Sequence, residues 1–247
     1  MSIQKVKKRN ASQIVKKELV ELIKEGYFQD GLLPSEEMLA SKFGVSRITI
    51  RDALASLENL KYISRAQGKD TVINKNVAAL GCRVCEGVAF KDLIRAQGYQ
   101  VSWHTFPIEK ILMPDFAKEL LNTSASDAYC IKTLYFANGV PALYSVNYLP
   151  PDIVDDSIFF IPLDKKGLFE CLNDRYEFPE VSYDIIEIKP VCADEVLADL
   201  FRAPIHKALL LLESVCFDNK QNSLFCTSEY YNTSVLPFKE VRNAWYF

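Results

Sequence analysis

Residues 33–60 read LPSEEMLASKFGVSRITIRDALASLENL, and this stretch decides the fold of the first part of the chain. Ser35 follows a proline and precedes two glutamates, so we expect it to cap a helix whose dipole favours acidic residues in its first turn. Gly44 ends that helix, and Ser46 caps the next, in which apolar residues recur at helical spacing from Ile50 onwards. Two helices joined by such a tight turn form a helix-turn-helix.

The segments on either side extend this motif. Residues 12–25 carry apolar residues at helical spacing, which predicts an amphipathic helix before the motif. Residues 63–73 read as two short strands around a basic turn that contains Gly68 and Lys69. The sequence therefore predicts a winged helix-turn-helix.

Basic and hydroxyl side chains gather at the start of the second helix of the motif. Arg47 and Arg51 lie one turn apart beside its apolar stripe, and Ser46 and Thr49 lie at the same end. A recognition helix needs this pattern, because the arginine fork fits guanine edges and short hydroxyls reach phosphates. A merely solvated helix face is the alternative. Internal ion pairs that lock both arginines would contradict the DNA-binding interpretation.

We therefore predict that the recognition helix and the turn between the two strands contact DNA together. The turn would enter the adjacent minor groove or grip the backbone. The candidate DNA-binding residues from this pattern are Ser46, Arg47, Thr49, Arg51, Gly68 and Lys69.

The distribution of charge favours nucleic acid at one end only. The first 75 of the 247 residues hold 14 lysines and arginines against nine acidic residues, a net charge of +5, and the remainder carries −8. The composition, 49% hydrophobic and 25% charged, excludes a disordered chain, a collagen and a coiled-coil rod. No apolar run approaches the ~18 residues of a membrane helix, and no secretory signal is evident. We expect a cytoplasmic protein with no membrane partner.

The remainder of the chain alternates helical and extended patterns. Asn138-Gly139 is a strong hairpin signal between two predicted strands, because a type I′ turn needs positive φ twice. A second hairpin is predicted around residues 218–220. We expect an antiparallel sheet with helices segregated around it, an α+β fold. The chain then divides into a winged-helix domain, a linker and an α+β domain at residues 1–75, 76–88 and 89–247.

The motif resembles the winged-helix signature of GntR-type transcriptional regulators. The residues that carry the resemblance are Leu33–Ala40, Phe43–Leu54 and Leu57–Leu60. It implies DNA contacts by Ser35, Arg47, Thr49, Arg51 and Gly68. The chain departs from the family at Glu37, where an arginine is frequent, and at Asp70, where the wing usually has a second glycine.

The α+β domain is similar to the UTRA domain of the HutC subfamily, which shares its fold with chorismate lyase. The resemblance is carried by Phe90–Leu93 running to Gly98, the Asn138–Pro141 turn and Tyr148–Pro150. It implies a domain that binds a small effector and alters operator affinity. The implied effector-binding positions are Ala89, Phe90, Lys132, Thr133, Tyr135, Ser145, Tyr148 and Tyr231.

The family pattern for anionic effectors is largely absent. Family members often place arginines, a glutamate and a serine where this chain has Thr133 and Tyr135, Ser145, and Ala89. We therefore expect an effector other than a sugar phosphate. It could stack on Tyr135, Tyr144 or Tyr148, although tyrosines on half-buried strands more often only pack in the core.

Other functions have few residues to draw on. The two histidines, His104 and His206, have no suitably spaced nucleophile, so we predict no enzyme, no cofactor and no metal site. A chorismate-lyase-like activity in the α+β domain is the alternative. Cys82 and Cys85 form a lone CxxC in the linker, which leaves a thiol- or metal-responsive regulator open.

The expected assembly is a homodimer on a palindromic, double-stranded operator, because one short helix offers too few base contacts for useful specificity. We expect a repressor whose operator affinity is modulated by a small-molecule effector. The sequence leaves the effector, the operator and the sign of regulation open.

Overall fold

The chain folds into two units. The computed structural model describes residues 8–80, 83, 87, 89–163, 166–176, 178–179 and 181–242, with side chains from residue 11. The first unit consists of Met1–Gly87 with Phe238–Phe247, and the second of Val88–Pro237. Cys82 and Cys85 lie outside the described residues. In the described part of the chain, no helix is long and apolar enough to cross a membrane.

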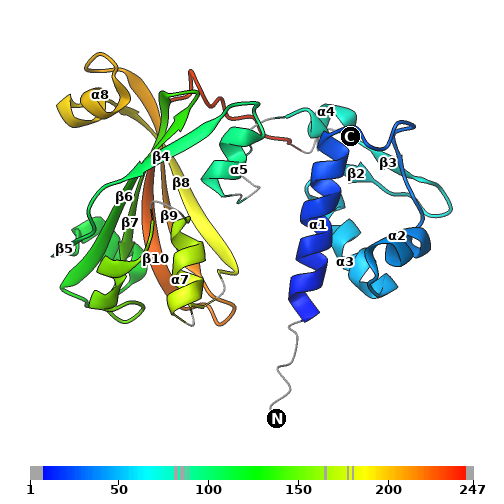
Figure 1. The fold of residues 1–247 in the computed structure, drawn as a ribbon, viewed down its shortest axis with the longest axis horizontal. Coiled ribbons are helices and arrows are strands. Elements are labelled where there is room, and N and C mark those ends of the chain that lie inside the picture. Colours follow the sequence, from blue (N-terminus) through cyan, green and yellow to red (C-terminus); the bar gives the residue numbers. More distant parts are fainter. Residues whose placement is uncertain are drawn as a thin grey trace, which may run out of the picture. The chain divides into compact units, whose positions relative to one another are not determined.

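The first unit is a winged helix-turn-helix (Figure 1). Its three short strands pair antiparallel in the order β1-β3-β2. In chain order its elements are α1 (Lys8–Lys24), β1 (Leu32–Leu33), α2 (Glu36–Phe43), α3 (Arg47–Asn59), β2 (Ile63–Ser64), β3 (Thr71–Ile73) and α4 (Lys75–Ala78). The helix-turn-helix and both wing strands are confirmed, and the structure adds β1 and α4, the latter where the sequence suggests a linker.

The helix boundaries in this unit follow from local capping. The Ser35 hydroxyl accepts a hydrogen bond from the Met38 amide at 3.2 Å, and Ser46 accepts one from Thr49 at 3.1 Å. Each replaces a backbone partner that the first turn of a helix lacks. Gly44 ends α2 in the left-handed conformation at φ +63°, which a glycine adopts without strain.

The core of the first unit lies where α1 packs on α3. Leu19 of α1 and Ile50 and Leu57 of α3 are fully buried, and so is Tyr62 after α3. Burying each such aliphatic side chain contributes ~1.5–3 kcal/mol. This packing fixes which face of α3 remains exposed.

The second unit is an α+β domain on a seven-stranded sheet. Neighbouring strands are antiparallel in the order β4-β6-β7-β10-β9-β8, and β5 pairs with β6. Its elements are α5 (Phe90–Arg95), β4 (Val101–Thr105), β5 (Glu109–Leu112), α6 (Asp115–Leu121), β6 (Asp127–Ala137), β7 (Val140–Leu149), η2 (a 3₁₀ helix, Asp156–Phe160), α7 (Leu168–Arg175), β8 (Tyr183–Cys192), α8 (Glu195–Phe201), β9 (Ala208–Phe217) and β10 (Ser223–Tyr231).

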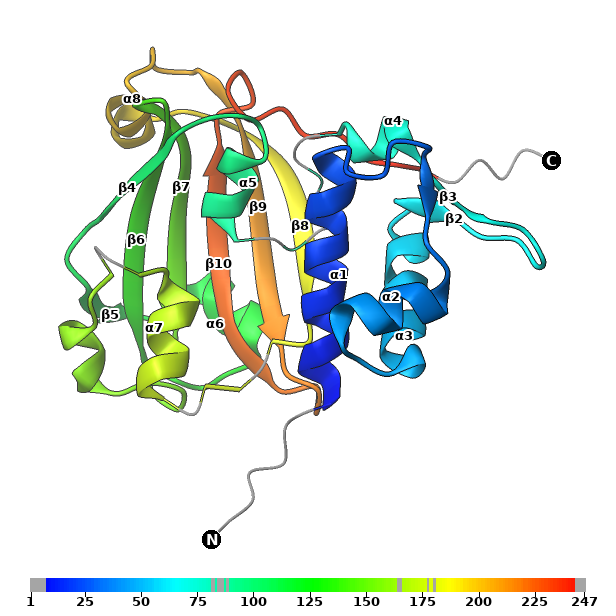
Figure 2. The same ribbon diagram turned by 45° about the vertical axis from the view of Figure 1, so that its right-hand side comes forward.

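Helices cover the two faces of this sheet separately (Figure 2). Leu172 of α7 packs in one cluster with Phe225 of β10, whereas Leu121 of α6 packs in another with Cys226. Successive residues of a strand point to opposite faces, so α7 and α6 lie on opposite faces of the sheet. Figure 2 shows α5 and α7 in front of the strands, on the same side. We call the side covered by α5 and α7 the inner face.

The end of the chain departs from the predicted domain division. Residues 238–242 belong to the first unit rather than to the α+β domain. Glu240 forms an ion pair with Arg83 at 3.1 Å, and Arg83 also donates to the Leu60 carbonyl at 2.9 Å. The Arg83 side chain is only 2% exposed. These contacts join segments more than 150 residues apart in the sequence, which no local pattern predicts.

Candidate functional site

The exposed face of α3 carries its polar residues. Ile50 and Ala53 face the core, whereas Arg47 and Arg51 are exposed, and Ile48 is 66% exposed beside them. In the described part of the chain, Arg47 makes no ion pair. The first turn of α3 therefore presents a free guanidinium to solvent.

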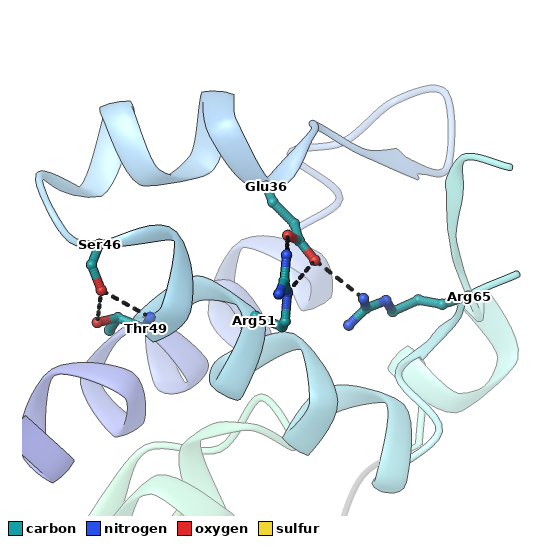
Figure 3. A network of polar contacts seen from close by, with 5 residues as sticks. All are labelled: Glu36, Ser46, Thr49, Arg51 and Arg65. Atoms are coloured by element: carbon teal, nitrogen blue, oxygen red, sulfur yellow. Dashed lines mark hydrogen bonds and ion pairs between the residues drawn. The ribbon is translucent and has the colours of Figure 1, made fainter. Parts of the chain in front are cut away.

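Arg51 is held by an ion pair with Glu36 at the start of α2 (Figure 3). Its Nε and Nη2 lie 3.3 and 3.0 Å from Oε2 of Glu36, and Arg65 reaches Oε1 of the same carboxylate at 3.2 Å. The Arg51 hydrogen bond, with the charges of Arg51, Arg65 and Arg47, holds the pKa of Glu36 below its usual value. Because the Arg51 side chain is still 60% exposed, this pair orients its guanidinium without burying it.

The hydroxyl groups near the helix starts serve as caps. The Ser46 and Thr49 hydroxyls share a hydrogen bond of 2.8 Å at the start of α3, as Figure 3 shows. Ser35 has the same capping role for α2. All three sit at helix N-termini, where backbone amides and the helix dipole favour an anion such as a phosphate.

The wing turn has the glycine geometry that the sequence suggests. Gly68 has φ +72°, which other residues adopt only with strain, and Lys69 closes the turn by donating its amide to the Ala66 carbonyl at 3.1 Å. Lys69 and Asp70 are both exposed. The turn therefore offers one cation and one anion side by side.

Glu36→Gln should strengthen binding to random duplex DNA and steepen its salt dependence. Removing the carboxylate frees Arg51 and Arg65 for phosphates, and each added phosphate contact increases the slope of log affinity against log salt by about one. Fluorescence anisotropy at several salt concentrations measures both effects.

Glu37→Gln is the matched control for this change, because it removes the same charge from the next residue of α2. Glu37 is exposed and has no ion pair among the described residues. Equal slopes for the two variants would show that Glu36 does not restrain the arginines.

A second group of polar residues lies on the inner face of the α+β sheet. Cross-strand pairing places Thr133 of β6 opposite Ser145 of β7, and Ser145 opposite Glu229 of β10. Thr105 of β4 continues this row and shares a hydrogen bond of 3.2 Å with Thr133. Ser145 is 1% exposed. One row of polar groups therefore crosses four strands inside the domain.

The neighbouring row on the inner face is also polar and buried. Asn147, Thr227 and Ser214 are paired across β7, β10 and β9. Asn147 donates to the Ser145 hydroxyl at 3.2 Å, and the Ser214 and Thr227 hydroxyls share a hydrogen bond of 3.0 Å. Buried polar groups cost free energy unless they are hydrogen-bonded, and these bonds meet that requirement within the layer.

Glu229 is the acidic member of this group. It is partly buried, and its carboxylate accepts hydrogen bonds from the Thr227 hydroxyl at 3.0 Å and the Tyr231 hydroxyl at 2.7 Å. Burial raises the pKa of Glu229 to about 7, an effect that these two hydrogen bonds oppose and the negative charge of Asp184 reinforces. The carboxyl group is therefore poised between its neutral and ionised forms near neutral pH.

The structure brings six of the eight predicted effector-binding residues to this region. Thr133, Ser145, Tyr135 and Tyr231 point to the inner face by register. Phe90, at the start of α5, contacts the Tyr135 ring edge-on at 5.3 Å between centroids, and Ala89 is the N-cap of α5.

Lys132 and Tyr148 lie on the opposite face, which corrects their predicted grouping. Their neighbours along the strands, Thr133 and Asn147, point inward, so these two point away. Lys132 pairs with Glu109 at 2.6 Å, and Tyr148 packs edge-on against Phe116 of α6. We leave both residues out of the site.

Tyr144 also points away from the inner face. Its ring stacks on Tyr230 and meets Phe106 edge-on. Sequence reasoning missed Asn147, Thr227 and Glu229, although alternation with Tyr231 along the predicted strand could have indicated the last two.

Glu229→Gln should stabilise the second unit at high pH only. A carboxyl group whose pKa rises on folding, here from 4.5 to about 7, destabilises the folded state increasingly as the pH passes from the lower to the higher value. The variant should gain about 2–3 kcal/mol of unfolding free energy at pH 8 and almost nothing at pH 4.5.

Urea unfolding across this pH range measures the difference. Trp103 and Trp245 are the two tryptophans, so a Trp245→Phe background leaves Trp103, in β4, as the reporter. A difference that stays constant with pH would contradict a raised pKa for Glu229.

Metal binding finds no support in the described residues, among which no group of three or more His, Cys, Asp or Glu side chains could hold an ion. Burial raises the pKa of the Cys130, Cys216 and Cys226 thiols, which disfavours the thiolate that reacts or binds metal.

The two units match two known families. Residues 11–73 match the family described as bacterial regulatory proteins, gntR family, and residues 96–236 match the UTRA domain. The chain belongs to the GntR family and carries a UTRA domain. This GntR-family protein is a transcriptional regulator, and both resemblances drawn from its sequence are confirmed.

Relatives that match this GntR-family chain over most of its length are transcriptional regulators. The uncharacterized HTH-type transcriptional regulator YurK of Bacillus subtilis (strain 168) is 23% identical over 219 residues, which cover 87% of this chain and 88% of YurK. The probable fructoselysine utilization operon transcriptional repressor of Escherichia coli (strain K12) is 23% identical over 222 residues, which cover 86% of this chain and 88% of that protein.

Solved structures share the fold. The possible transcriptional regulator YydK from Bacillus subtilis superposes with a TM-score of 0.69 at 19% identity, over 94% of this chain and 99% of YydK. PhnF from Mycobacterium smegmatis superposes with a TM-score of 0.59 at 18% identity, over 93% of this chain and 99% of PhnF.

Proposed function

We propose that this regulator is a repressor that binds a palindromic operator as a homodimer and responds to a small molecule bound on the inner face of its UTRA domain. The observation that carries the DNA half is the exposed first turn of α3. There Arg47 makes no ion pair among the described residues, and Arg51 is 60% exposed while it pairs with Glu36, so both guanidinium groups reach solvent where a major groove could approach.

The wing and the helix starts supply the remaining contacts of each half-site. Lys69 and the N-termini of α2 and α3, at Ser35 and Ser46, would hold phosphates and so set the position of α3 on the duplex. Two copies are required because one short helix reads too few base pairs, and a palindrome matches the twofold symmetry of a dimer.

The polar rows on the inner face support the effector half of the proposal. Thr133, Ser145 and Asn147 are buried hydrogen-bonding groups beside the aromatic rings of Phe90 and Tyr135. Small-molecule sites combine aromatic walls with a few placed polar groups in this way. Effector binding would change operator affinity by favouring one of two arrangements of the DNA-binding units, which requires different effector affinities in the two.

No observation on the described residues favours the enzymatic alternative, and the relatives point to regulation. The thiol- or metal-responsive alternative rests on Cys82 and Cys85, which lie outside the described residues.

Selection of genomic fragments by the purified full-length protein tests this proposal. We expect enrichment of a few fragments that share an inverted repeat, and a mass of two chains per repeat by light scattering of the complex. Recovery of random fragments only, or of one chain per site, would contradict the proposed mode of binding.

Ser145→Leu tests the effector half, with Tyr148→Phe as its control on the opposite face of the sheet. The genes beside the enriched operator suggest candidate metabolites. A metabolite that releases the wild-type protein from the operator should fail on Ser145→Leu and act normally on Tyr148→Phe. Unchanged release of the Ser145→Leu variant would place the effector elsewhere.

A further inference from the structure

We propose that the effector carries a positively charged nitrogen group, such as an ammonium, amidinium or guanidinium, and that Glu229 is its counter-ion. The inference rests on the proposed function, because it names the ligand chemistry of the same inner-face site. It goes beyond the sequence-based expectation, which only argues against a sugar phosphate.

The position of Glu229 makes it the centre of the polar rows. It lies on the central strand β10, with Ser145 beside it on β7 and Leu212 beside it on β9. The hydroxyls of Thr227 and Tyr231 hold one carboxylate oxygen each, so the group is fixed in orientation before any ligand arrives. A preorganised acceptor of this kind favours a ligand that donates hydrogen bonds and brings charge.

The charges on the inner face leave this carboxylate unbalanced. Within the described part of the chain, Glu229 has no ion pair. Two lysines lie on this side, Lys91 of α5 over the Trp103 ring at 3.5 Å and Lys110 of β5 in an ion pair with Asp156, but the charge that shifts the pKa of Glu229 is that of Asp184. The next acidic side chain on the same face, Asp184 of β8, only adds to the negative potential at Glu229.

An organic cation also matches the aromatic groups beside the carboxylate. Tyr231 donates its hydroxyl hydrogen to Glu229. Leu143 of β7 is the cross-strand neighbour of Tyr231, and Tyr135 of β6 is the next neighbour in the same row. The Tyr135 ring contacts Phe90 of α5. The faces of aromatic rings attract cations and stack on flat groups such as an amidinium. Neither polar row contains an arginine or a lysine that could pair with an anion, and Lys91 of α5, on the same side of the sheet, lies over the Trp103 ring.

A purely structural role explains the position less well. A glutamine or a further hydroxyl would satisfy Thr227 and Tyr231 without the cost of burying an ionisable carboxyl group. Burying an ionised carboxylate costs free energy, and a well-placed cation offsets part of that cost. A neutral Glu229 that merely accepts two hydrogen bonds is the competing account, and the experiment below separates the two.

Three probes of nearly equal shape test the charge preference: benzamidinium, benzamide and benzoate. Their binding to the full-length protein is measured by ligand-observed NMR and calorimetry up to millimolar concentrations. We expect benzamidinium to bind and benzoate not to bind. Glu229→Gln should weaken benzamidinium about tenfold or more. Glu213→Gln, which removes a carboxylate from the opposite face of β9, should leave it unchanged.

The outcomes distinguish this inference from the proposed function. If benzoate or benzamide binds more tightly than benzamidinium, and Ser145→Leu abolishes that binding, the inner-face site stands but the proposal that the effector is a cation is wrong. Benzamidinium binding that persists in Glu229→Gln, or no binding by any probe, would overturn the assignment of Glu229. Operator binding is measured separately, so its loss or retention bears on the proposed function alone. The pH-dependent stability gain of Glu229→Gln confirms that the variant folds.

Discussion

Replacing Arg47 and Arg51 by alanine together should weaken operator binding by about 2–6 kcal/mol, because an arginine fork on a guanine edge contributes ~1–3 kcal/mol and separated base contacts add roughly. Arg47→Ala alone should cost ~1–3 kcal/mol and relax the preference at the base pairs that it reads. Arg51→Ala should also leave Glu36 paired with Arg65 alone, so that its negative charge is less balanced and repels the DNA backbone. Anisotropy titrations on the enriched operator measure the loss of affinity, and comparison with a random duplex measures the loss of base preference.

Arg95→Ala is the control for the loss of positive charge. Arg95 is exposed on α5 in the second unit and pairs with Asp92 of its own helix, so it lies outside the proposed DNA-contacting surface. We expect its operator affinity to equal that of the wild type. If Arg95→Ala and Arg47→Ala lose similar amounts of operator affinity, the loss reflects net charge alone, and α3 has no special role in binding.

Glu240→Ala should destabilise the DNA-binding unit by about 1–3 kcal/mol, although Glu240 lies near the other end of the chain. It leaves the guanidinium of Arg83, 2% exposed, without the carboxylate at 3.1 Å. Breaking a buried ion pair from one side is costly because the remaining charge stays buried. Glu240 itself is 42% exposed, which is why the expected loss lies below that of a fully buried pair.

Hydrogen exchange of α3 amides in the full-length protein measures this loss. Glu240→Ala should accelerate exchange in α1 and α3 about tenfold or more, with β6 and β7 of the second unit unaffected. Glu195→Ala, on α8 of the second unit, is the matched control. Unchanged exchange in α3 would mean that the end of the chain does not support the DNA-binding unit.

The sequence predicts well whatever depends on neighbouring residues. Ser35 and Ser46 cap their helices as expected, and Gly44 ends α2, because each acts within its own turn. Asn138 and Gly139 both have positive φ at the predicted hairpin. These local signals determine the order of the elements and hence the winged helix and the antiparallel sheet.

Long-range pairing limits what the sequence can predict about the sites. The Arg51–Glu36 and Arg83–Glu240 pairs join residues whose proximity depends on tertiary packing. The misplacement of Lys132 and Tyr148 has another cause. β6 and β7 are covered on both faces, so their burial shows no alternation from which the inner face could be identified.

Methylation interference on the enriched operator tests the central claim, that Arg47 and Arg51 read guanine edges in the major groove. Methylation of guanine N7 blocks one of the two acceptors that an arginine fork uses. We expect guanines in both half-sites whose methylation prevents binding of the wild type but does not change binding of the Arg47→Ala, Arg51→Ala double variant. The same interference pattern for both proteins, or none for the wild type, would contradict it.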